Sequence, residues 1–280
     1  MIVCIMVENN PLVTIVTPVF KKRSTINDTI KSILIQDYNH IEYIVIDDGP
    51  GSVVDEQIKT LCMDLIPLRI IHNCTNLGIS ESLNKAVEHA NGKYIVTIAD
   101  DDCLYESNTI SKLVDEFESS GADIIVGRCA MFNNDLSVCI FTDSEEDWIS
   151  YHQKNGSLFD ELSGYNKILG CVTMKTRQYL KTDEGRYDSE YKLIEDYPFI
   201  LKAVRNNVEI HFFNSILIKY RSGGRSSFGN ISMAYLIESN TIFKNEVYPY
   251  SKHKFYALSS YCKWVAKVIL FKICRVFRVR

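Results

Sequence analysis

The sequence lacks the motifs that define several common protein classes. Its nine cysteines form no CxxC pair. Their odd number and scattered positions predict reduced, mostly structural thiols rather than a disulfide framework or a zinc site. No GxGxxG follows the first predicted strand, which disfavours a dehydrogenase-type dinucleotide fold, and the absence of GxxxxGK[ST] excludes a P-loop enzyme.

Long apolar runs are also missing. No segment reaches the length of a transmembrane helix. The apolar residues 1–7 have no basic start and end at Glu8, unlike a signal peptide. We therefore expect a cytoplasmic protein. The net charge of −4 does not suggest a nucleic-acid partner, and 280 residues provide for one large α/β domain or two small ones.

Strand and helix patterns alternate along the first half of the chain. β-branched apolar runs predict strands at 12–16, 43–46, 68–71, 94–98 and 122–126. Helices are predicted near 24–34, 53–63, 80–90 and 108–119. This alternation is typical of βαβ units and predicts an α/β fold with a mostly parallel sheet flanked by helices.

The alternation weakens beyond about residue 130. Residues 148–164 have the pattern of a loop, and residues 191–204 that of a helix. Two strand pieces are predicted within residues 209–220, around Asn214, before the Gly- and Ser-rich residues 222–227.

The acidic run Asp100-Asp101-Asp102 follows a predicted buried strand. Adjacent carboxylates repel one another, so they favour a nearby cation. Mg²⁺ is commonly held by one or two carboxylates together with substrate phosphates. The alternative is a solvated turn, or a cap for the helix predicted to begin near Asn108.

Several motifs in order resemble the family 2 inverting glycosyltransferases of the GT-A fold. They are Thr17-Pro18-Val19-Phe20, Ser32 to Gln36, Glu42 to Gly49, Asn76-Leu77-Gly78, the acidic run, Glu195-Asp196 and Tyr220-Arg221. The resemblance covers residues from about 11 to 228. It implies a Rossmann-like GT-A sheet and a nucleotide-sugar donor, most often UDP-linked.

The resemblance also implies roles for individual donor-site residues. Asp48 corresponds to the acid that accepts a hydrogen bond from uracil, and Pro18 and Phe20 would wall the base. Asn76 and Gly78 would shape the donor loop, as would Asn84. The alternatives are a turn residue at Asp48, simple core packing at Phe20, an ordinary turn at Asn76 and Gly78, and a helix-surface position for Asn84.

In the acidic run, Asp101 corresponds to the ligand of Mn²⁺ or Mg²⁺, and Asp100 to the residue that reaches the ribose. Ala99 replaces an acid that the family usually carries. Asp102 would assist through a water or cap the next helix.

Asp196 corresponds to the catalytic base, which takes the proton of the acceptor hydroxyl as that oxygen attacks the sugar. Glu195 would orient it. Many relatives carry a His shortly after the Tyr-Arg pair, where this chain has Ser222-Gly223-Gly224. Arg221 or Arg225 could instead meet the diphosphate.

No acid follows Glu246, while lysines and arginines accumulate. A helix over 261–280 would place Val265, Ile269, Ile273, Val276 and Phe277 opposite Lys263, Lys267, Arg275 and Arg278. Such a basic amphipathic helix is typical of binding to an anionic membrane surface. Docking on the enzyme domain or on a second subunit, as in a homodimer, is the alternative.

The sequence thus predicts a GT-A domain at 1–228 and a basic helical extension at 229–280. Within the domain, about 11–128 would bind the nucleotide sugar and 129–228 the acceptor. We expect a sugar transferase acting on a glycan or polyprenyl-linked acceptor in surface polysaccharide synthesis, peripheral at the inner face of the cell membrane. A nucleotidyltransferase, or a non-catalytic scaffold that binds nucleotide sugars, is the alternative function.

Overall fold

The computed structural model describes residues 10–21, 24–50, 55–63, 65–142, 158–164, 168, 173–223 and 230–278. No helix in these residues is long and apolar enough to cross a membrane.

The strands of the described residues form one mixed sheet. Its strands are β1 (Val13–Val19), β2 (Ile41–Asp47), β3 (Leu68–His72), β4 (Tyr94–Thr97), β5 (Cys103–Leu104), β6 (Ile124–Phe132), β7 (Cys139–Thr142), β8 (Thr173–Thr176) and β9 (Ile210–Arg221). They lie in the order β3-β2-β1-β4-β8-β6-β9-β5, and β7 pairs with β6. Strands β3, β2, β1 and β4 are parallel, as the alternation predicts.

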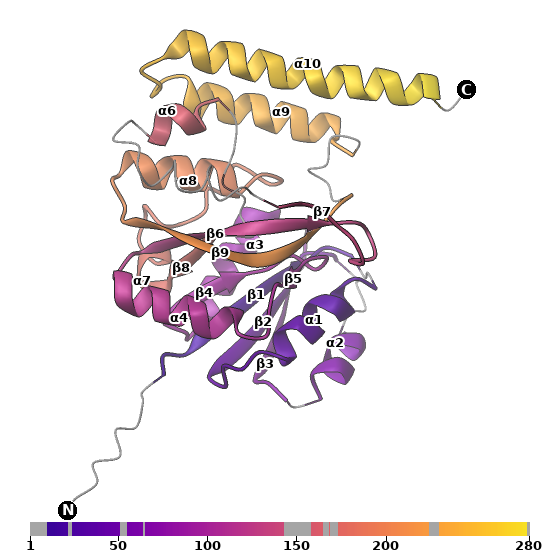
Figure 1. Ribbon diagram of the computed structural model, residues 1–280, viewed down its shortest axis with the longest axis vertical. Coiled ribbons are helices and arrows are strands. Elements are labelled where there is room, and N and C mark those ends of the chain that lie inside the picture. The colour runs from indigo at the N-terminus through magenta and orange to yellow at the C-terminus, as the bar shows by residue number, and fades with distance from the viewer. Residues whose placement is uncertain are drawn as a thin grey trace, which may run out of the picture.

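Helices cover both faces of the sheet (Figure 1). They are α1 (Ile26–Leu34), α2 (Asp55–Cys62), α3 (Ile79–His89), α4 (Thr109–Ser120), α6 (Leu158–Leu162), α7 (Arg177–Leu180), α8 (Asp196–Arg205), α9 (Met233–Ile242), the π-helix η2 (Phe243–Val247) and α10 (Lys254–Arg278). In Figure 1, α10 forms the outermost layer, and α9 and then α8 lie between it and the sheet.

The parallel strands bring chemically distinct chain segments to one edge of the sheet. Val19 at the end of β1 pairs with Asp47 at the end of β2, and Val16 pairs with Thr97 at the end of β4. Strands β2 and β4 therefore flank β1 and lie about 10 Å apart. The segments that follow all three strands meet at this edge.

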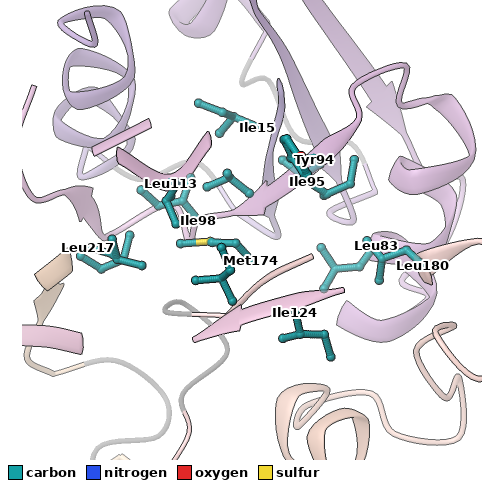
Figure 2. Packing of buried hydrophobic residues seen from close by; sticks show 14 of the residues in the cluster. Ile15, Leu83, Tyr94, Ile95, Ile98, Leu113, Ile124, Met174, Leu180 and Leu217 are labelled. Carbon is teal, nitrogen blue, oxygen red and sulfur yellow. The ribbon is translucent and has the colours of Figure 1, made fainter. Parts of the chain in front are cut away.

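Strand β8 joins the two halves of the sheet and is antiparallel to β4 and β6. Because side chains alternate along a strand, Met174 and Lys175 point to opposite faces. Met174 is fully buried in the main core, and Figure 2 shows it near Ile98 and Leu113. Lys175 points to the face that α8 covers.

Three local predictions differ from the structure. The helix predicted at 191–204 begins only at Asp196, because Pro198 tolerates just the first turn of a helix. Within the predicted loop at 148–164, residues Leu158–Leu162 form α6. Strand β9 is continuous rather than two pieces, although its register against β6 shifts near Asn214.

The C-terminal helix is longer than predicted and has two apolar sides. It begins at Lys254 and packs Ala257 and Val268 against the domain, where both are fully buried. Ile269 and Ile273, which the sequence places on the apolar side of the amphipathic helix, are 47% and 46% exposed. The helix therefore has a buried side at Ala257 and Val268 and an exposed apolar side at Ile269 and Ile273. The side chains of residues 275–280 lie outside the described part.

Candidate active site

Asp48 lies directly after β2 and organises the loop that precedes α3. Its carboxylate accepts hydrogen bonds from the Asn73 side chain at 3.0 Å, from the Leu77 N–H at 2.7 Å and from the Gly78 N–H at 2.9 Å. The residue is 7% exposed. A carboxylate has about four lone-pair positions, so Asp48 retains room for about one further donor.

The loop over residues 76–78 depends on a glycine. Gly78 has φ +86°, and a Cβ there would lie 2.7 Å from the Cβ of Lys192. The side chain of Asn76 accepts the Gly78 N–H at 3.0 Å, and α3 begins directly afterwards. The structure thus links the donor loop predicted from Asn76 and Gly78 to Asp48 and to the segment near Lys192.

Pro18 and Phe20 lie at the end of β1, beside Asp48, and both are half-buried. The Asp48 N–H donates to the Val19 carbonyl at 2.7 Å. A Cβ on Gly49 would lie 2.0 Å from the Phe20 carbonyl oxygen, so only glycine allows this approach. The residues predicted to wall a base and to bind it are therefore neighbours.

The acidic run forms a tight turn between β4 and β5, not a cap on a helix. Asp102 is 2% exposed and accepts the backbone N–H of Arg221 at 2.9 Å. Burial first, and then the charge of Asp101, raise the pKa of the Asp102 carboxyl well above its usual range. Asp102 is thus a structural member of the run.

The side chain of Arg221 stabilises this turn through hydrogen bonds. Its Nε donates to the Asp101 carbonyl at 2.7 Å, and its terminal nitrogens donate to Asp28 at 2.8 Å and to the Asn134 carbonyl. The residue is 6% exposed. We therefore assign Arg221 to the support of the acidic turn rather than to the diphosphate. Arg225 lies outside the described residues.

Asp100 and Asp101 are the other two carboxylates of the run. Asp100 is buried and Asp101 half-buried. The described residues contain no group of three or more His, Cys, Asp or Glu side chains arranged to hold a metal ion. A carboxylate pair nevertheless fits the set that Mg²⁺ or Mn²⁺ takes when substrate phosphates complete its coordination.

Asp196 is the first residue of α8, and Glu195 precedes it. The Asp196 carboxylate accepts the backbone N–H of Tyr197 at 2.7 Å. Burial, followed by the charge of Asp196, raises the pKa of Glu195 from 4.5 to about 8. Glu195 therefore holds its proton near neutral pH.

A cavity of about 10 Å³ connects this pair to the sheet. Thr97, Lys175, Tyr187, Glu195 and Asp196 all line it. Thr97 ends β4, three residues before Asp100, so the candidate base lies on the same side of the molecule as the acidic turn. The structure therefore places the candidate base near the end of the strand that leads into the acidic turn.

Helix α9 fixes the chain just before Asp196. The Glu238 carboxylate accepts three consecutive backbone N–H groups, from Lys192 at 3.0 Å, Leu193 at 2.8 Å and Ile194 at 2.7 Å. These contacts cross the predicted boundary at residue 228. That division stays a prediction, but residues on its C-terminal side support the site.

Sequence reasoning missed Lys175, Glu238 and the structural role of Arg221. It also expected Asn84 in the donor loop or on the helix surface. Asn84 is instead buried, and its side chain makes two hydrogen bonds with the backbone of Tyr187, at 2.8 and 2.9 Å. These four residues all contact residues far away in the chain, and the local sequence pattern does not predict such contacts.

A sequence model described as Glycosyl transferase family 2 matches residues 14–175, more than half of the chain. The chain belongs to glycosyl transferase family 2. The resemblance inferred from the motifs is thereby confirmed.

Relatives of this glycosyltransferase include bacterial proteins named as glycosyltransferases. GlyG of Streptococcus pneumoniae is 22% identical over 237 residues, which cover 84% of this chain and 68% of GlyG. TuaG of Bacillus subtilis, named a putative teichuronic acid biosynthesis glycosyltransferase, is 27% identical over 164 residues, covering 59% of this chain and 61% of TuaG. The glycosyltransferase is thus related to bacterial surface-polysaccharide enzymes.

Solved structures share the fold. Residues 1–349 of S. aureus TarS, in complex with UDP-GlcNAc, align with a TM-score of 0.65 at 15% identity, covering 96% of this chain and 76% of that one. The mannosyltransferase PcManGT from Pyrobaculum calidifontis, with GDP-Man and Mn²⁺, aligns with a TM-score of 0.60 at 13% identity, covering 98% and 82%. The predicted GT-A fold is confirmed.

Proposed function

We propose that this glycosyltransferase transfers a sugar, with inversion, from a UDP-sugar to a glycan or lipid-linked glycan in surface polysaccharide synthesis. The observation that carries the proposal is the convergence of the segments after β2, β1 and β4 at one sheet edge, with Asp196 on the same side. The match to TarS with UDP-GlcNAc supports a nucleotide-sugar donor of this class.

In this proposal the donor lies along the sheet edge. Asp48 accepts a hydrogen bond from the uracil ring with its remaining lone pair, while Pro18 and Phe20 contact the base. Asp100 accepts from a ribose hydroxyl. The width of about 10 Å between β2 and β4 allows the nucleoside to lie across β1.

Asp101, with its neighbour Asp100, would hold Mn²⁺ or Mg²⁺. When bound, the ion would offset the charge that develops on the diphosphate leaving group. Arg221 keeps the Asp101 backbone in place through the 2.7 Å hydrogen bond to its carbonyl. PcManGT, which was solved with Mn²⁺, supports the choice of ion.

Asp196 would act as the general base. It would take the proton from the acceptor hydroxyl as that oxygen attacks the anomeric carbon from the side opposite the nucleotide, which inverts the configuration. No second carboxylate is needed as an acid, because the diphosphate leaves without protonation. The acceptor would bind on the side formed by the segments after residue 129.

The outer face of α10 would bring the enzyme to the inner face of the cell membrane. This outer face consists of the exposed residues Phe255, Leu258, Ile269, Leu270 and Ile273. Exposed Lys263 and Lys267 flank it, and no acid follows Glu246. Apolar side chains beside lysines are the combination that binds anionic lipid headgroups.

Thermal unfolding with a panel of UDP- and GDP-sugars, with and without Mn²⁺, tests the donor. Ligand that binds the folded state raises the unfolding temperature by mass action. We expect stabilisation by UDP-sugars that requires the ion and that Asp101→Asn abolishes. Stabilisation without turnover of any acceptor would favour the non-catalytic scaffold, and stabilisation by none of the nucleotides would exclude the proposal.

A further inference from the structure

Lys175 is a buried lysine in the middle of the sheet. It lies in β8, opposite Ile95 of β4 and Ile124 of β6, and is 2% exposed. An ammonium group in such a place costs free energy unless an opposite charge compensates it. The proposed function gives this residue no role.

Aromatic rings hold the ammonium in position. The Nζ atom lies 5.7 Å from the ring centre of Tyr187 and 5.3 Å from that of Phe199. Cations are attracted to ring faces at such distances. The opposite charges come from the start of α8 and the residue before it, because Lys175 lines the same cavity as Glu195 and Asp196.

The charges of this cluster determine where its proton resides. Two carboxylates and one ammonium carry a net charge of −1, and one added proton makes the buried cluster neutral. Neutrality is favoured in a medium of low polarity. The Tyr197 N–H, 2.7 Å from Asp196, stabilises the ionised form of that carboxylate. The proton therefore resides on Glu195, whose pKa burial raises to about 8.

Other titratable groups near the pair do not replace the ammonium. Burial raises the pKa of Tyr187 and of Tyr235, so both phenols are neutral near pH 7. Glu238 of α9 adds negative charge, which its three N–H donors partly offset. Lys175 is the cation that the structure places among these described groups.

We infer that Lys175 is a positioning residue for the catalytic base: its buried ammonium leaves a single proton on the Glu195–Asp196 pair and so keeps Asp196 ionised. This inference rests on the base role of Asp196 in the proposed function. Without the ammonium, the cluster reaches neutrality only with two protons. Asp196 then carries one of them and cannot accept another from the acceptor.

The test compares Lys175→Met, which removes the charge, with Lys175→Arg, which keeps it. The first readout needs no substrate: the free energy of unfolding from denaturant titrations between about pH 6 and 9. Folded Lys175→Met retains an additional proton in this range, so its stability falls more steeply with pH than that of wild type. Lys175→Arg retains the wild-type slope.

The second readout is the pH profile of Mn²⁺-dependent sugar transfer to water, measured as UDP release from UDP-GlcNAc. Water replaces the acceptor hydroxyl and needs the same base. We expect the acid limb to move up by about one pH unit or more in Lys175→Met and to return in Lys175→Arg. A purely structural role would lower the rate without displacing the limb.

Lys93→Met is the matched control. Lys93 lies over the ring of Tyr94 at 5.1 Å and pairs with Glu118 at 2.6 Å, but on the molecular surface. Neither the pH dependence of its stability in this range nor the acid limb of its pH profile should change.

If Lys175→Met does not fold, Glu195→Gln replaces it. With Lys175 then facing one carboxylate, the stability slope should flatten and the acid limb should move down.

Equal stability slopes in wild type and folded Lys175→Met, or an unchanged slope in Glu195→Gln, would overturn the inference. The proposed function fails separately, if wild type releases no UDP from any UDP-sugar in the panel while the stability slopes still differ as described.

Discussion

A hydrogen bond of 2.9 Å joins the backbone N–H of Arg221 to the carboxylate of Asp102, and so ties the end of β9 to the acidic turn after β4. The two residues are 119 positions apart. This contact explains why the third acid of the run is buried. It supports the backbone that presents Asp101, rather than adding a third ligand for a cation.

Asp102→Ala tests this support. The substitution leaves the Arg221 N–H buried without an acceptor, so we expect the free energy of unfolding to fall by about 1–3 kcal/mol. Affinity for a UDP-sugar with Mn²⁺ should fall as well, because the acidic turn loses one of its hydrogen bonds to Arg221. Asp115→Ala removes an exposed acid of α4 and should leave both quantities unchanged. A fully stable Asp102→Ala protein would show that the contact is dispensable.

Gly78→Ala tests the donor loop. The new Cβ would lie 2.7 Å from that of Lys192, at a φ of +86°. Gly121→Ala is the matched control, since Gly121 also has a positive φ but nothing within 4 Å of its Cβ position. We expect Gly78→Ala to lose about 1–3 kcal/mol more stability than Gly121→Ala in denaturant titrations. Equal losses would mean that the loop moves freely away from Lys192.

Glu238→Ala tests the support of Asp196 by α9. Three backbone N–H groups lose a charged acceptor, so we expect a loss of about 1.5–3 kcal/mol in stability. The rate of sugar transfer should fall with little change in donor KM, because Asp196 and not the donor loop is displaced. Glu238→Gln retains one acceptor oxygen, so its stability and its transfer rate should lie between those of wild type and Glu238→Ala. An unchanged rate in a destabilised Glu238→Ala protein would separate α9 from catalysis.

Glu195 should make stability depend on pH. Its pKa in the folded protein is about 8, raised from 4.5, so its contribution is complete below about pH 4.5 and is lost as pH rises toward 8. Glu195→Gln does not titrate. We therefore expect the variant to gain about 1–3 kcal/mol on wild type between pH 5 and 8 in denaturant titrations. A constant difference across that range would place the proton elsewhere.

Substitutions on the outer face of α10 test membrane binding without exposing the core. Truncating the helix would remove the fully buried Ala257 and Val268. Lys263→Glu combined with Lys267→Glu should instead weaken binding to anionic vesicles by about tenfold or more. Ile269→Ser should also weaken it, whereas Ile140→Ser, at a more exposed position on β7, should not. Vesicle binding that is equal in all variants would favour docking to a second copy of the chain.

Much of the donor half could be predicted from local sequence. Apolar runs that end in Asp48 or Asp100 have a strand pattern followed by a turn pattern, and parallel pairing then brings the ends together. The structure of the acceptor half is harder to predict from local sequence. Lys175 lies in the short strand β8, whose sequence Thr-Met-Lys-Thr gives no sign that the lysine ammonium is buried beneath Phe199. The partners of Glu238 and Arg221 are backbone groups far along the chain, which no side-chain pattern records.

The release of UDP from UDP-sugars tests the assignment of Asp101 and Asp196 most directly. Wild-type protein should release UDP at a rate that requires Mn²⁺ or Mg²⁺. Asp101→Asn should abolish both release and ion-dependent UDP binding, whereas Asp196→Asn should abolish release and leave UDP binding intact. Metal-independent release, or release that persists in both variants, would contradict these roles.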